Sequence, residues 1–457
     1  MSNRDPELVR RYGGQGPRYT SYPSALQFHE QVDGDDYAEV IREGNTDQRP
    51  LSLYFHIPFC NTVCYYCACN RIITANKARG EPFMDDLERE MDLHAQRVDT
   101  RRPVVQLHWG GGTPTWLDDA QITELMFLTG RRFRLLEEGG DYAIEIDPRT
   151  VDDGRLGLLR GIGFNRVSLG VQDLDPRVQK AVNRIQPEAM IRDRVQEIRD
   201  HEYHSLSMDL ILGLPCQSEG SLALTLEKII ALGPDRLSLF NYAHLPERFK
   251  VQRQINDDAL PSPEEKLRMQ IRAARMLEEA GYIHVGMDHF AQPDDELARA
   301  QRAGTLHRNF QGYTLHGEAD LIAMGPSAIS QLGDLYAQNH KDLQDWGDAL
   351  RTGQLPFERG YRLSRDDRIR RDLIIRLLCD MEIDIPAFED RWGLHFEQYF
   401  AAECPRLDEL AREGLLHINE HGFRLTETGR TFARAVAMVF DRYLSAAETN
   451  RRFSRIL

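Results

Sequence analysis

Short apolar segments alternate with longer stretches of helical periodicity through the first half of the chain. The short segments are LSLYFHI (51–57), VVQLHWG (104–110), YAIEID (142–147), RVSLGVQ (166–172), LSMDLIL (206–212) and RLSLFNYA (236–243). Helices are predicted between them, for example over residues 82–96, 195–201 and 220–233. This alternation predicts parallel strands joined by helical crossovers, which is an α/β fold. Six such units can form an open or partial barrel.

Polar or glycine-rich residues follow each of the six segments. They are HIPFC with a group of cysteines, GGGTPT, DPR, QD, GLP and NYAHLP. In parallel α/β folds, ligands bind where the strands reach their carboxyl ends. Glycine and proline also end strands for purely structural reasons, and that explanation suffices for any single strand. Six polar strand ends in succession favour one shared cavity.

The pattern changes on both sides of this predicted barrel. Residues 1–48 are a polar lead in which GPRYTSYP (16–23) predicts an extended or looped segment. A further helix is predicted over residues 263–281, and an amphipathic helix over 365–381 opens a mostly helical C-terminal part that ends in a hairpin and a helix. The predicted domains are an N-terminal arm (1–48), a partial barrel with extensions (49–364) and a helical C-terminal domain (365–457).

Composition narrows the possible functions. The chain of 457 residues has 57 Lys and Arg against 72 Asp and Glu, a net charge of -15. This balance speaks against a general nucleic-acid binder but allows a local basic pocket. Apolar runs long enough for a membrane span are absent from the sequence, and the polar N-terminus lacks the apolar core of a signal peptide. We therefore predict a cytoplasmic protein without a membrane span.

Four of the seven cysteines lie in CNTVCYYCAC, residues 60–69. A disulfide framework is disfavoured in the reducing cytoplasm. Structural zinc sites usually take two separated cysteine pairs, and a second pair is missing here. Closely spaced thiolates are typical of iron–sulfur clusters. Cys60, Cys64 and Cys67 could bind three irons of a [4Fe-4S] cluster and leave the fourth iron to a ligand that is not protein.

The C-x3-C-x2-C spacing after a first barrel strand resembles the radical S-adenosylmethionine (SAM) enzymes. Within that superfamily the chain resembles the oxygen-independent coproporphyrinogen III oxidase family, from about residue 16 to the final FSRIL. The resemblance is carried by PRYTSYP, LYFHIPFCNTVCYYCACN, QLHWGGGTPT, EIDPR, GFNRVSLGVQD, DLILGLP, FNYAHLP, GMDHFA, HRNFQGYT and MGPSAIS. It implies a partial (β/α)6 radical-SAM barrel. Cys69 is typical of this family and absent from many relatives.

The resemblance also implies a set of site residues. Cys60, Cys64 and Cys67 hold one [4Fe-4S] cluster, with Cys69 nearby but not a ligand, and two SAM molecules bind. The first SAM, on the unique iron, is contacted by Tyr54, Gly110, Glu145, Gln172, Arg184 and Asp209. Residues toward the second SAM are Tyr66, Gly111, Gly112, Ala243 and Ile329. Taken singly, each of these side chains is more often a surface, capping or core residue. Their shared register at the strand ends favours a site.

The reaction implied is that of an oxidoreductase of haem biosynthesis. A 5′-deoxyadenosyl radical formed from SAM at the cluster takes a hydrogen atom from the β-carbon of a propionate, which then loses carbon dioxide and becomes a vinyl group. Two such steps convert coproporphyrinogen III to protoporphyrinogen IX. The reaction needs an electron donor and an acceptor, which the sequence does not identify. We expect a monomer with no nucleic-acid partner.

The substrate brings four carboxylates to an acidic chain, so a local cluster of cations is predicted at the mouth of the barrel. Arg18 in PRYTSYP and Arg308 in HRNFQGYT are the candidates, and Gln311 is a weaker one. The arm that carries Arg18 is expected to fold over the mouth as part of a lid.

Three other functions remain open at this point. Some close relatives of the family carry haem, although they usually lack the extra cysteine and the PRYTSYP arm. A radical methylase would use the second SAM as a methyl donor. A structural zinc protein would be colourless and loaded with zinc.

Overall fold

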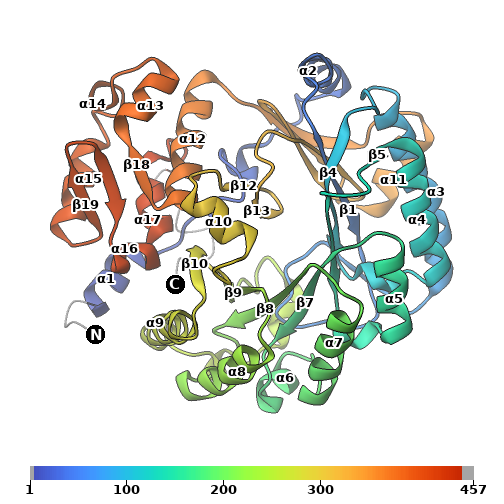
Figure 1. The fold of residues 1–457 in the computed structure, drawn as a ribbon, viewed down its shortest axis with the longest axis horizontal. Coiled ribbons are helices and arrows are strands. Elements are labelled where there is room, and N and C mark those ends of the chain that lie inside the picture. Colours follow the sequence, from blue (N-terminus) through green and yellow to red (C-terminus); the bar gives the residue numbers. More distant parts are fainter. Residues whose placement is uncertain (1–4, 445–457) are drawn as a thin grey trace.

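The main sheet contains the strands that the apolar pattern predicts (Figure 1). The structure is a computed structural model and describes residues 5–444. Residues 1–4 and 445–457, with the final FSRIL and the outer ends of the predicted arm and C-terminal domain, lie outside the described residues. Six strands run parallel in the order β1 (Leu51–Ile57), β4 (Pro103–Gly111), β6 (Asp141–Ile146), β7 (Arg166–Gln172), β8 (Ser205–Leu212) and β9 (Arg236–Asn241). The predicted limits agree with these bounds to within two residues.

Helical crossovers cover the outer face of this sheet (Figure 1). They are α3 (Gly80–Ala95), α4 (Asp119–Arg132), α5 (Asp153–Gly161), α6 (Pro176–Ala181), α7 (Glu188–Asp200) and α8 (Glu219–Leu232). Capping boxes begin α4 at Asp118 and α8 at Ser218. Because strands and helices share one apolar core, β1 is buried along nearly its whole length. The predicted α/β partial barrel is confirmed.

Further strands extend the sheet at both ends and leave it open. Beyond α9 (Pro263–Glu279), the antiparallel strands β10 (Ile283–Gly286) and β11 (His289–Ala291) lie next to β9. A parallel strand, β14 (Asp320–Met324), lies on the free side of β1. It is followed by the antiparallel β15 (Ile329–Leu332), β16 (Leu335–Asn339) and β17 (Phe357–Arg362). Smaller elements are β5 (Arg134–Leu135) beside β4, α10 (Glu296–Arg302), the hairpin β12 (His307–Asn309) and β13 (Gly312–Thr314), and α11 (Leu343–Arg351).

The arm packs against two different parts of the molecule. Helix α1 (Asp5–Tyr12) and the extended residues after it bury Tyr12, Tyr19 and Tyr22 in the core of the C-terminal region. Helix α2 (Gly34–Asp47), which the apolar pattern did not predict, belongs to the core of the barrel. Its sequence is mostly polar, and a short apolar stripe of only a few residues is what packs inward.

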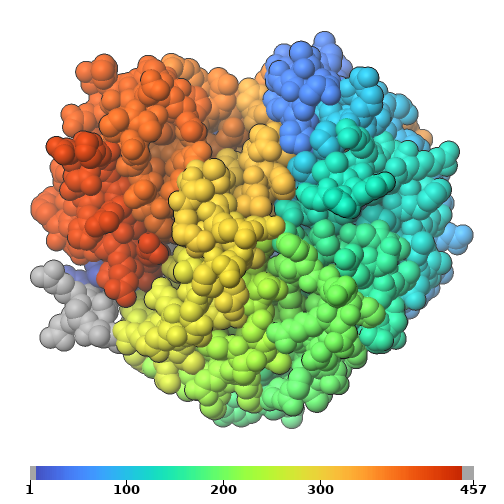
Figure 2. Space-filling model, in the orientation of Figure 1, coloured from blue at the N-terminus to red at the C-terminus, as the bar shows by residue number. Residues whose placement is uncertain are grey.

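The C-terminal region has its own apolar core (Figure 1, orange to red). Its elements are α12 (Arg365–Asp380), β18 (Glu382–Asp384), α13 (Ile385–Trp392), α14 (Phe396–Tyr399), α15 (Cys404–Arg412), β19 (Leu416–Asn419), β20 (Gly422–Leu425), α16 (Glu427–Thr431) and α17 (Ala433–Ala437). The predicted hairpin is present as β19 and β20, with β18 as a third strand. The single helix predicted after it is wrong, because Phe432 has non-helical φ and ψ angles (-105° and 20°) and divides the segment into α16 and α17. In Figure 2, the yellow residues around 260–320 lie between this region and the barrel.

A buried ion pair joins β14 to the start of the barrel. The side chains of Arg102 and Asp320 are 0% and 2% exposed, and Arg102 Nη2 donates to the Asp320 carboxylate. Arg102 also donates to Asn45 Oδ1 at 2.9 Å, and Arg49 Nε lies 3.2 Å from Asp320 Oδ1. Asp320 thus holds two arginines where α2, β4 and β14 meet.

Within residues 5–444, none of the helices is long and apolar enough to cross a membrane.

We expect Asp320→Asn to lower the apparent free energy of unfolding by about 3–5 kcal/mol, because it leaves Arg102 buried without a charged partner. Urea unfolding followed by circular dichroism measures the change. Arg101→Gln is the matched control, since the Arg101 side chain is 87% exposed and its ion pair with Asp99 is screened by solvent. Equal effects of the two substitutions would contradict a structural role for the buried pair.

Candidate active site

The cysteine loop leaves the carboxyl end of β1 and is fastened by its backbone. The short parallel strands β2 (Phe59–Cys60) and β3 (Ile72–Ile73) close its base, with Thr74 N donating to Cys60 O at 2.9 Å. The far side is held at the end of α6, where Tyr65 N donates to Val182 O at 3.0 Å and Asn183 Nδ2 donates to Val63 O at 2.8 Å. The shape of the loop is therefore set by contacts of the protein alone.

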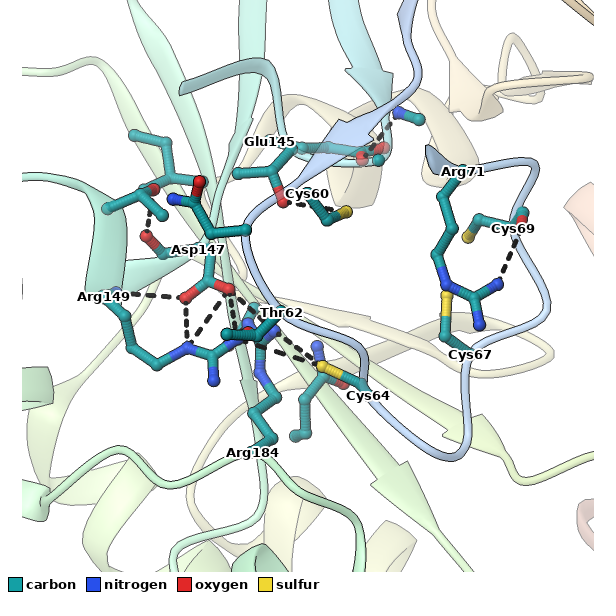
Figure 3. Close-up of a pocket in the computed structure, with 18 of the residues that line it drawn as sticks. Cys60, Thr62, Cys64, Cys67, Cys69, Arg71, Glu145, Asp147, Arg149 and Arg184 are labelled. Atoms are coloured by element: carbon teal, nitrogen blue, oxygen red, sulfur yellow. Dashed lines mark hydrogen bonds and ion pairs between the residues drawn. The ribbon is translucent and has the colours of Figure 1, made fainter. Parts of the chain in front are cut away.

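Cys60, Cys64 and Cys67 face one cavity of about 340 Å³ from different sides of this loop (Figure 3). All seven cysteines are free thiols. Within residues 5–444, groups of three or more His, Cys, Asp or Glu side chains that converge on a single metal ion are absent. A tetrahedral zinc ion needs its ligands around one point, whereas an iron–sulfur cluster takes each thiolate at a different iron. The three thiols, on different sides of the cavity, fit a [4Fe-4S] cluster.

Cations surround the thiols. Arg184 Nη1 lies 3.6 Å from Cys64 Sγ, and Arg149 Nη2 lies 3.9 Å from it. A hydrogen bond from Cys69, with a further contribution from Arg71, lowers the pKa of Cys67 to about 6, while burial raises the pKa of Cys60 to about 11. Positive charge near a thiol favours the thiolate, which is the form that binds iron.

Cys69 faces the same cavity but differs from the other three cysteines. Its thiol is engaged with Cys67, and this hydrogen bond and burial raise the pKa of Cys69. Arg71 Nη1 donates to its carbonyl oxygen at 3.0 Å. The structure thus brings all four thiols of the loop to one place, and the prediction that Cys69 is not a ligand stays a prediction.

The glycines that end β4 approach the cysteine loop too closely for any side chain. A Cβ on Gly110 would lie 2.7 Å from Glu145 Oε1, and one on Gly112 would lie 2.7 Å from the Pro58 backbone. Gly111 has a φ of 111°, which disfavours a side chain in any case. Gly111 and Gly112 line the cavity, whereas Gly110 lies beneath Glu145. The N–H groups of this run are used within the protein, since Gly111 N donates to Glu145 and Gly112 N donates to Ile57 O at 2.8 Å, so the glycines let the backbone approach closely rather than supply free donors.

Glu145 reaches into the cavity from β6. Its carboxylate accepts hydrogen bonds from His108 Nε2 at 3.2 Å and from Gly111 N at 3.3 Å. Burial raises its pKa, but these donors outweigh burial and the pKa is lowered, so the group is ionised. Tyr54 stacks on the His108 ring with centroids 5.8 Å apart and supports this carboxylate from behind.

Arg184 stands on the opposite side of the cavity and is 7% exposed. It donates to Asp147 Oδ2 at 3.0 Å and to Gly170 O at 2.7 Å, and its Nε is buried without a partner among residues 5–444. Asp147 is held in turn by Arg149 Nη2 at 2.7 Å. Burial raises the Asp147 pKa, but the two arginines outweigh burial and lower it. Asp147 thus orients a guanidinium group that still has an unsatisfied donor.

Gln172 and Asp209 complete the wall between β7 and β8. Gln172 has a φ of 69°, and the pairing of β7 with β8 shifts register between Gly170 and Gln172. Asp209 accepts a hydrogen bond from Ser168 Oγ at 2.7 Å, and burial raises its pKa to about 6. Both side chains line the cavity, where the family resemblance places them near the first SAM.

The cavity does not include every predicted residue. Tyr66 lines it, and Ala243 lies just behind, because Gln252 Nε2 donates to the carbonyl oxygens of both residues. Ile329 packs instead with aromatic rings beside β16. Arg18, Arg308 and Gln311 also lie outside the lining of this cavity. A second SAM position at Tyr66, Ala243 and Ile329 stays a prediction.

The sequence interpretation missed Asp147, Arg149 and Arg71 as cavity residues. Asp147 and Arg149 belong to the DPR that follows the third predicted strand, so their position at a strand end was an available signal. Arg71 lies only two residues beyond Cys69 in the sequence, and this proximity to the cysteines was the signal that could have identified it.

The arrangement suits a zwitterionic ligand. The carboxylate of Glu145 stands on one side of the cavity, and the guanidinium of Arg184, whose Nε has no partner among residues 5–444, stands on the other. A guanidinium binds a ligand carboxylate, and a carboxylate binds an ammonium group or hydroxyl groups. The donor set thus fits both a [4Fe-4S] cluster and the amino-acid end of SAM.

Comparisons with known proteins agree with this geometry. Residues 54–229 match the Radical SAM superfamily, and residues 363–432 match the HemN C-terminal domain. The chain is 50% identical to the oxygen-independent coproporphyrinogen III oxidase of Pseudomonas aeruginosa over 454 residues, covering 99% of this chain and 98% of that protein. It is 46% identical to the enzyme of the same name from Escherichia coli over 453 residues, with the same coverage of 99% and 98%.

The solved structure of coproporphyrinogen III oxidase (HemN) from Escherichia coli, described as a radical SAM enzyme, superposes with a TM-score of 0.91 at 45% identity. The match covers 96% of this chain and 99% of that one. Identity and fold therefore agree over nearly the full length, and the chain belongs to the oxygen-independent coproporphyrinogen III oxidase family of the radical SAM superfamily.

Proposed function

We propose that this protein converts two propionate side chains of coproporphyrinogen III to vinyl groups without oxygen, giving protoporphyrinogen IX in haem biosynthesis. Each propionate loses one hydrogen atom from its β-carbon and its carboxylate as carbon dioxide, and one electron passes to an acceptor. The observation that carries this proposal is the cavity of three separated thiols beside Glu145 and Arg184, in a chain that matches this family over its full length.

Cys60, Cys64 and Cys67 would hold one [4Fe-4S] cluster, and SAM would occupy the iron that lacks a thiolate. When bound, these groups supply one-electron chemistry that removes a hydrogen atom from carbon. Glu145 and Arg184 orient the amino-acid end of SAM, and Asp209 and Gln172 close the wall beside it. Tyr66, Gly111, Gly112, Ala243 and Ile329 are assigned to a second SAM molecule on the strength of the family resemblance.

The remaining partners are proposed on chemical grounds. Coproporphyrinogen III is the substrate, with Arg18, Arg308 and Gln311 on its side of the site, and one electron donor and one acceptor are needed. We place the enzyme in the cytoplasm as a monomer that binds no nucleic acid. We assign the arm of residues 1–48 to the lid, an assignment supported by the hydrogen bond from Arg18 to the carbonyl oxygen of Asn241 at the end of β9.

An oxygen-free assay tests the function directly. Reconstituted protein, a reductant, SAM and coproporphyrinogen III should yield protoporphyrinogen IX, detected as a product with two vinyl groups. Haem binding without vinyl product would instead identify a haem carrier, and a methylated product would identify a methylase. A colourless protein loaded with zinc would exclude the proposal.

Among single cysteine variants, Cys60→Ser, Cys64→Ser and Cys67→Ser should each lose the stable cluster, because serine is a poor ligand for iron in such clusters. Cys69→Ser should keep a full complement of iron and sulfide. Iron and sulfide analysis with the visible absorption spectrum measures this. Cys216→Ser, at an exposed thiol outside the cysteine loop, is the control. Loss of the cluster in Cys69→Ser would make Cys69 a ligand and overturn the assignment.

Glu145→Gln should weaken SAM binding about tenfold or more, because a charged hydrogen-bonding partner of the ligand becomes neutral. Equilibrium dialysis of SAM against the reconstituted variant gives the dissociation constant. Glu138→Gln, at an exposed position outside the cavity, is the matched control. An unchanged affinity for SAM would remove Glu145 from the site.

Deletion of residues 1–25 should abolish formation of the vinyl product if the arm is part of the lid. Iron content and SAM affinity should stay near those of the full chain, since the thiols, Glu145 and Arg184 lie outside the deleted segment. Product formation is measured in the oxygen-free assay above. A truncated enzyme of unchanged activity would show that the arm does not serve the reaction.

A further inference from the structure

Two arginines from distant parts of the chain meet the short segment Gly16–Tyr19 of the arm, which itself carries a third arginine. Arg434 in α17 donates from Nε to Pro17 O at 3.0 Å and from Nη2 to Gly16 O at 2.6 Å. Arg308 in β12 donates from Nε to Tyr19 O at 3.3 Å. Arg18 belongs to the segment itself. We call Arg18, Arg308 and Arg434 the arginine cluster.

The arginine cluster lies at the end of the barrel where the site is built. Arg18 Nη2 donates to the carbonyl oxygen of Asn241, the last residue of β9, at 2.7 Å. The neighbouring strand β8 carries Asp209, which lines the cavity of the cysteine loop. The arm, the barrel and the C-terminal region therefore come together at the carboxyl end of β9.

The positive charge of this cluster is deeply buried. Arg308 and Arg434 are 7% and 8% exposed. Within residues 5–444, the groups that hold Arg18 and Arg308 are uncharged: backbone carbonyl oxygens and, for Arg308, the ring of Tyr313 with its centre 4.8 Å from the guanidinium carbon. Burial and the charges of Arg18 and Arg308 lower the pKa of Arg434 to about 10, although Asp288 opposes this. Like charges held close together, such as those of Arg18 and Arg308, are unfavourable unless an anion joins them.

Several buried polar atoms around the cluster have no partner among the described residues. They are Arg308 Nη1, both amide atoms of Gln311, Asn241 Oδ1 and His289 Nδ1. The ring of His289 meets that of Tyr313 edge-on, with centroids 5.1 Å apart, and Tyr313 lies beneath Arg308. Most buried polar groups in proteins are hydrogen-bonded, and an unsatisfied one costs about 1–3 kcal/mol. The presence of several unsatisfied polar atoms near the cluster indicates that a polar ligand forms hydrogen bonds with them.

We propose that Arg434, acting with Arg18 and Arg308, binds propionate carboxylates of the substrate, so that the C-terminal region supplies part of the substrate site. This assignment rests on the function proposed above. A carboxylate accepts from the unpaired Nη1 of Arg308 and replaces the arm carbonyl oxygens at Arg434. Separate arginines on three segments suit a ligand whose carboxylates are spread over a large ring, as in coproporphyrinogen III. The competing explanation is that the cluster only fastens the arm.

Binding of two stable porphyrins to the full-length reconstituted protein separates these explanations. Coproporphyrin III carries four carboxylates and mesoporphyrin IX carries two, and fluorescence titration gives both dissociation constants. We expect the unsubstituted protein to prefer coproporphyrin III. Arg434→Gln should weaken coproporphyrin III binding about 10- to 100-fold while changing mesoporphyrin IX binding much less, because one charge-assisted contact is lost.

Matched variants guard against misfolding and general charge effects. Arg434→Lys should recover only part of the preference, since lysine cannot bind a carboxylate in a fork. Arg308→Gln changes the same cluster from a hairpin outside the C-terminal region. It should also weaken coproporphyrin III binding, and it tests the assignment even if Arg434→Gln disturbs folding. Arg192→Gln removes an arginine that is 65% exposed on the outer helix α7 and should change neither constant.

Two results would overturn the assignment. If Arg434→Gln and Arg308→Gln weaken both porphyrins equally, or neither, the cluster only fastens the arm. If the unsubstituted protein binds coproporphyrin III no better than mesoporphyrin IX, the protein does not recognise the two additional carboxylates. Failure of the oxygen-free assay to give vinyl product, with the porphyrin preference intact, would instead count against the proposed function and leave the carboxylate site standing.

Discussion

The central constraint in this protein is the separation of three thiols on a loop whose shape is fixed by its own backbone. Hydrogen bonds to β3 and to the end of α6 hold the loop open, so Cys60, Cys64 and Cys67 approach one cavity from different sides. Thiols placed in this way suit a cluster in which each thiolate binds a separate iron. In the proposed site, three protein ligands for four irons would leave one iron for a small molecule, and Glu145 and Arg184 would lie beside that position.

Charge is distributed across the cavity to match such a molecule. Glu145 is kept ionised on one side by His108 and Gly111 N, and Arg184 is oriented on the other side by Asp147. Glu145 lies near the carboxyl end of β6 and Arg184 lies in the connection after α6, so the fold brings side chains from separate crossovers to the same edge of the sheet. Farther along the same edge, the arginine cluster adds positive charge to a chain whose net charge is -15. The overall acidity of the protein therefore conceals a locally basic region.

The parts that sequence predicted well are those governed by local periodicity. The six parallel strands follow from short buried segments such as residues 51–57 and 166–172, which the structure reproduces without change. Helix α2 was missed because its buried apolar stripe is short. The segment after β20 was predicted as a single helix because the break at Phe432 lies in its backbone angles, and its residue type does not signal a break. The strand-end position located Glu145 and the family resemblance located Asp209, whereas Asp147 was missed although it also follows a predicted strand. Arg434 meets Gly16 across 418 residues of sequence, a separation that no local pattern reports.

The vacant iron position is the claim on which the mechanism depends, and electron paramagnetic resonance of the reduced, oxygen-free protein tests it most directly. The account predicts a [4Fe-4S] signal that changes when SAM is added, with isotope-labelled SAM coupled to one iron. A cluster whose signal is indifferent to SAM, because the protein ligates all four irons, would contradict the account, as would the absence of a cluster.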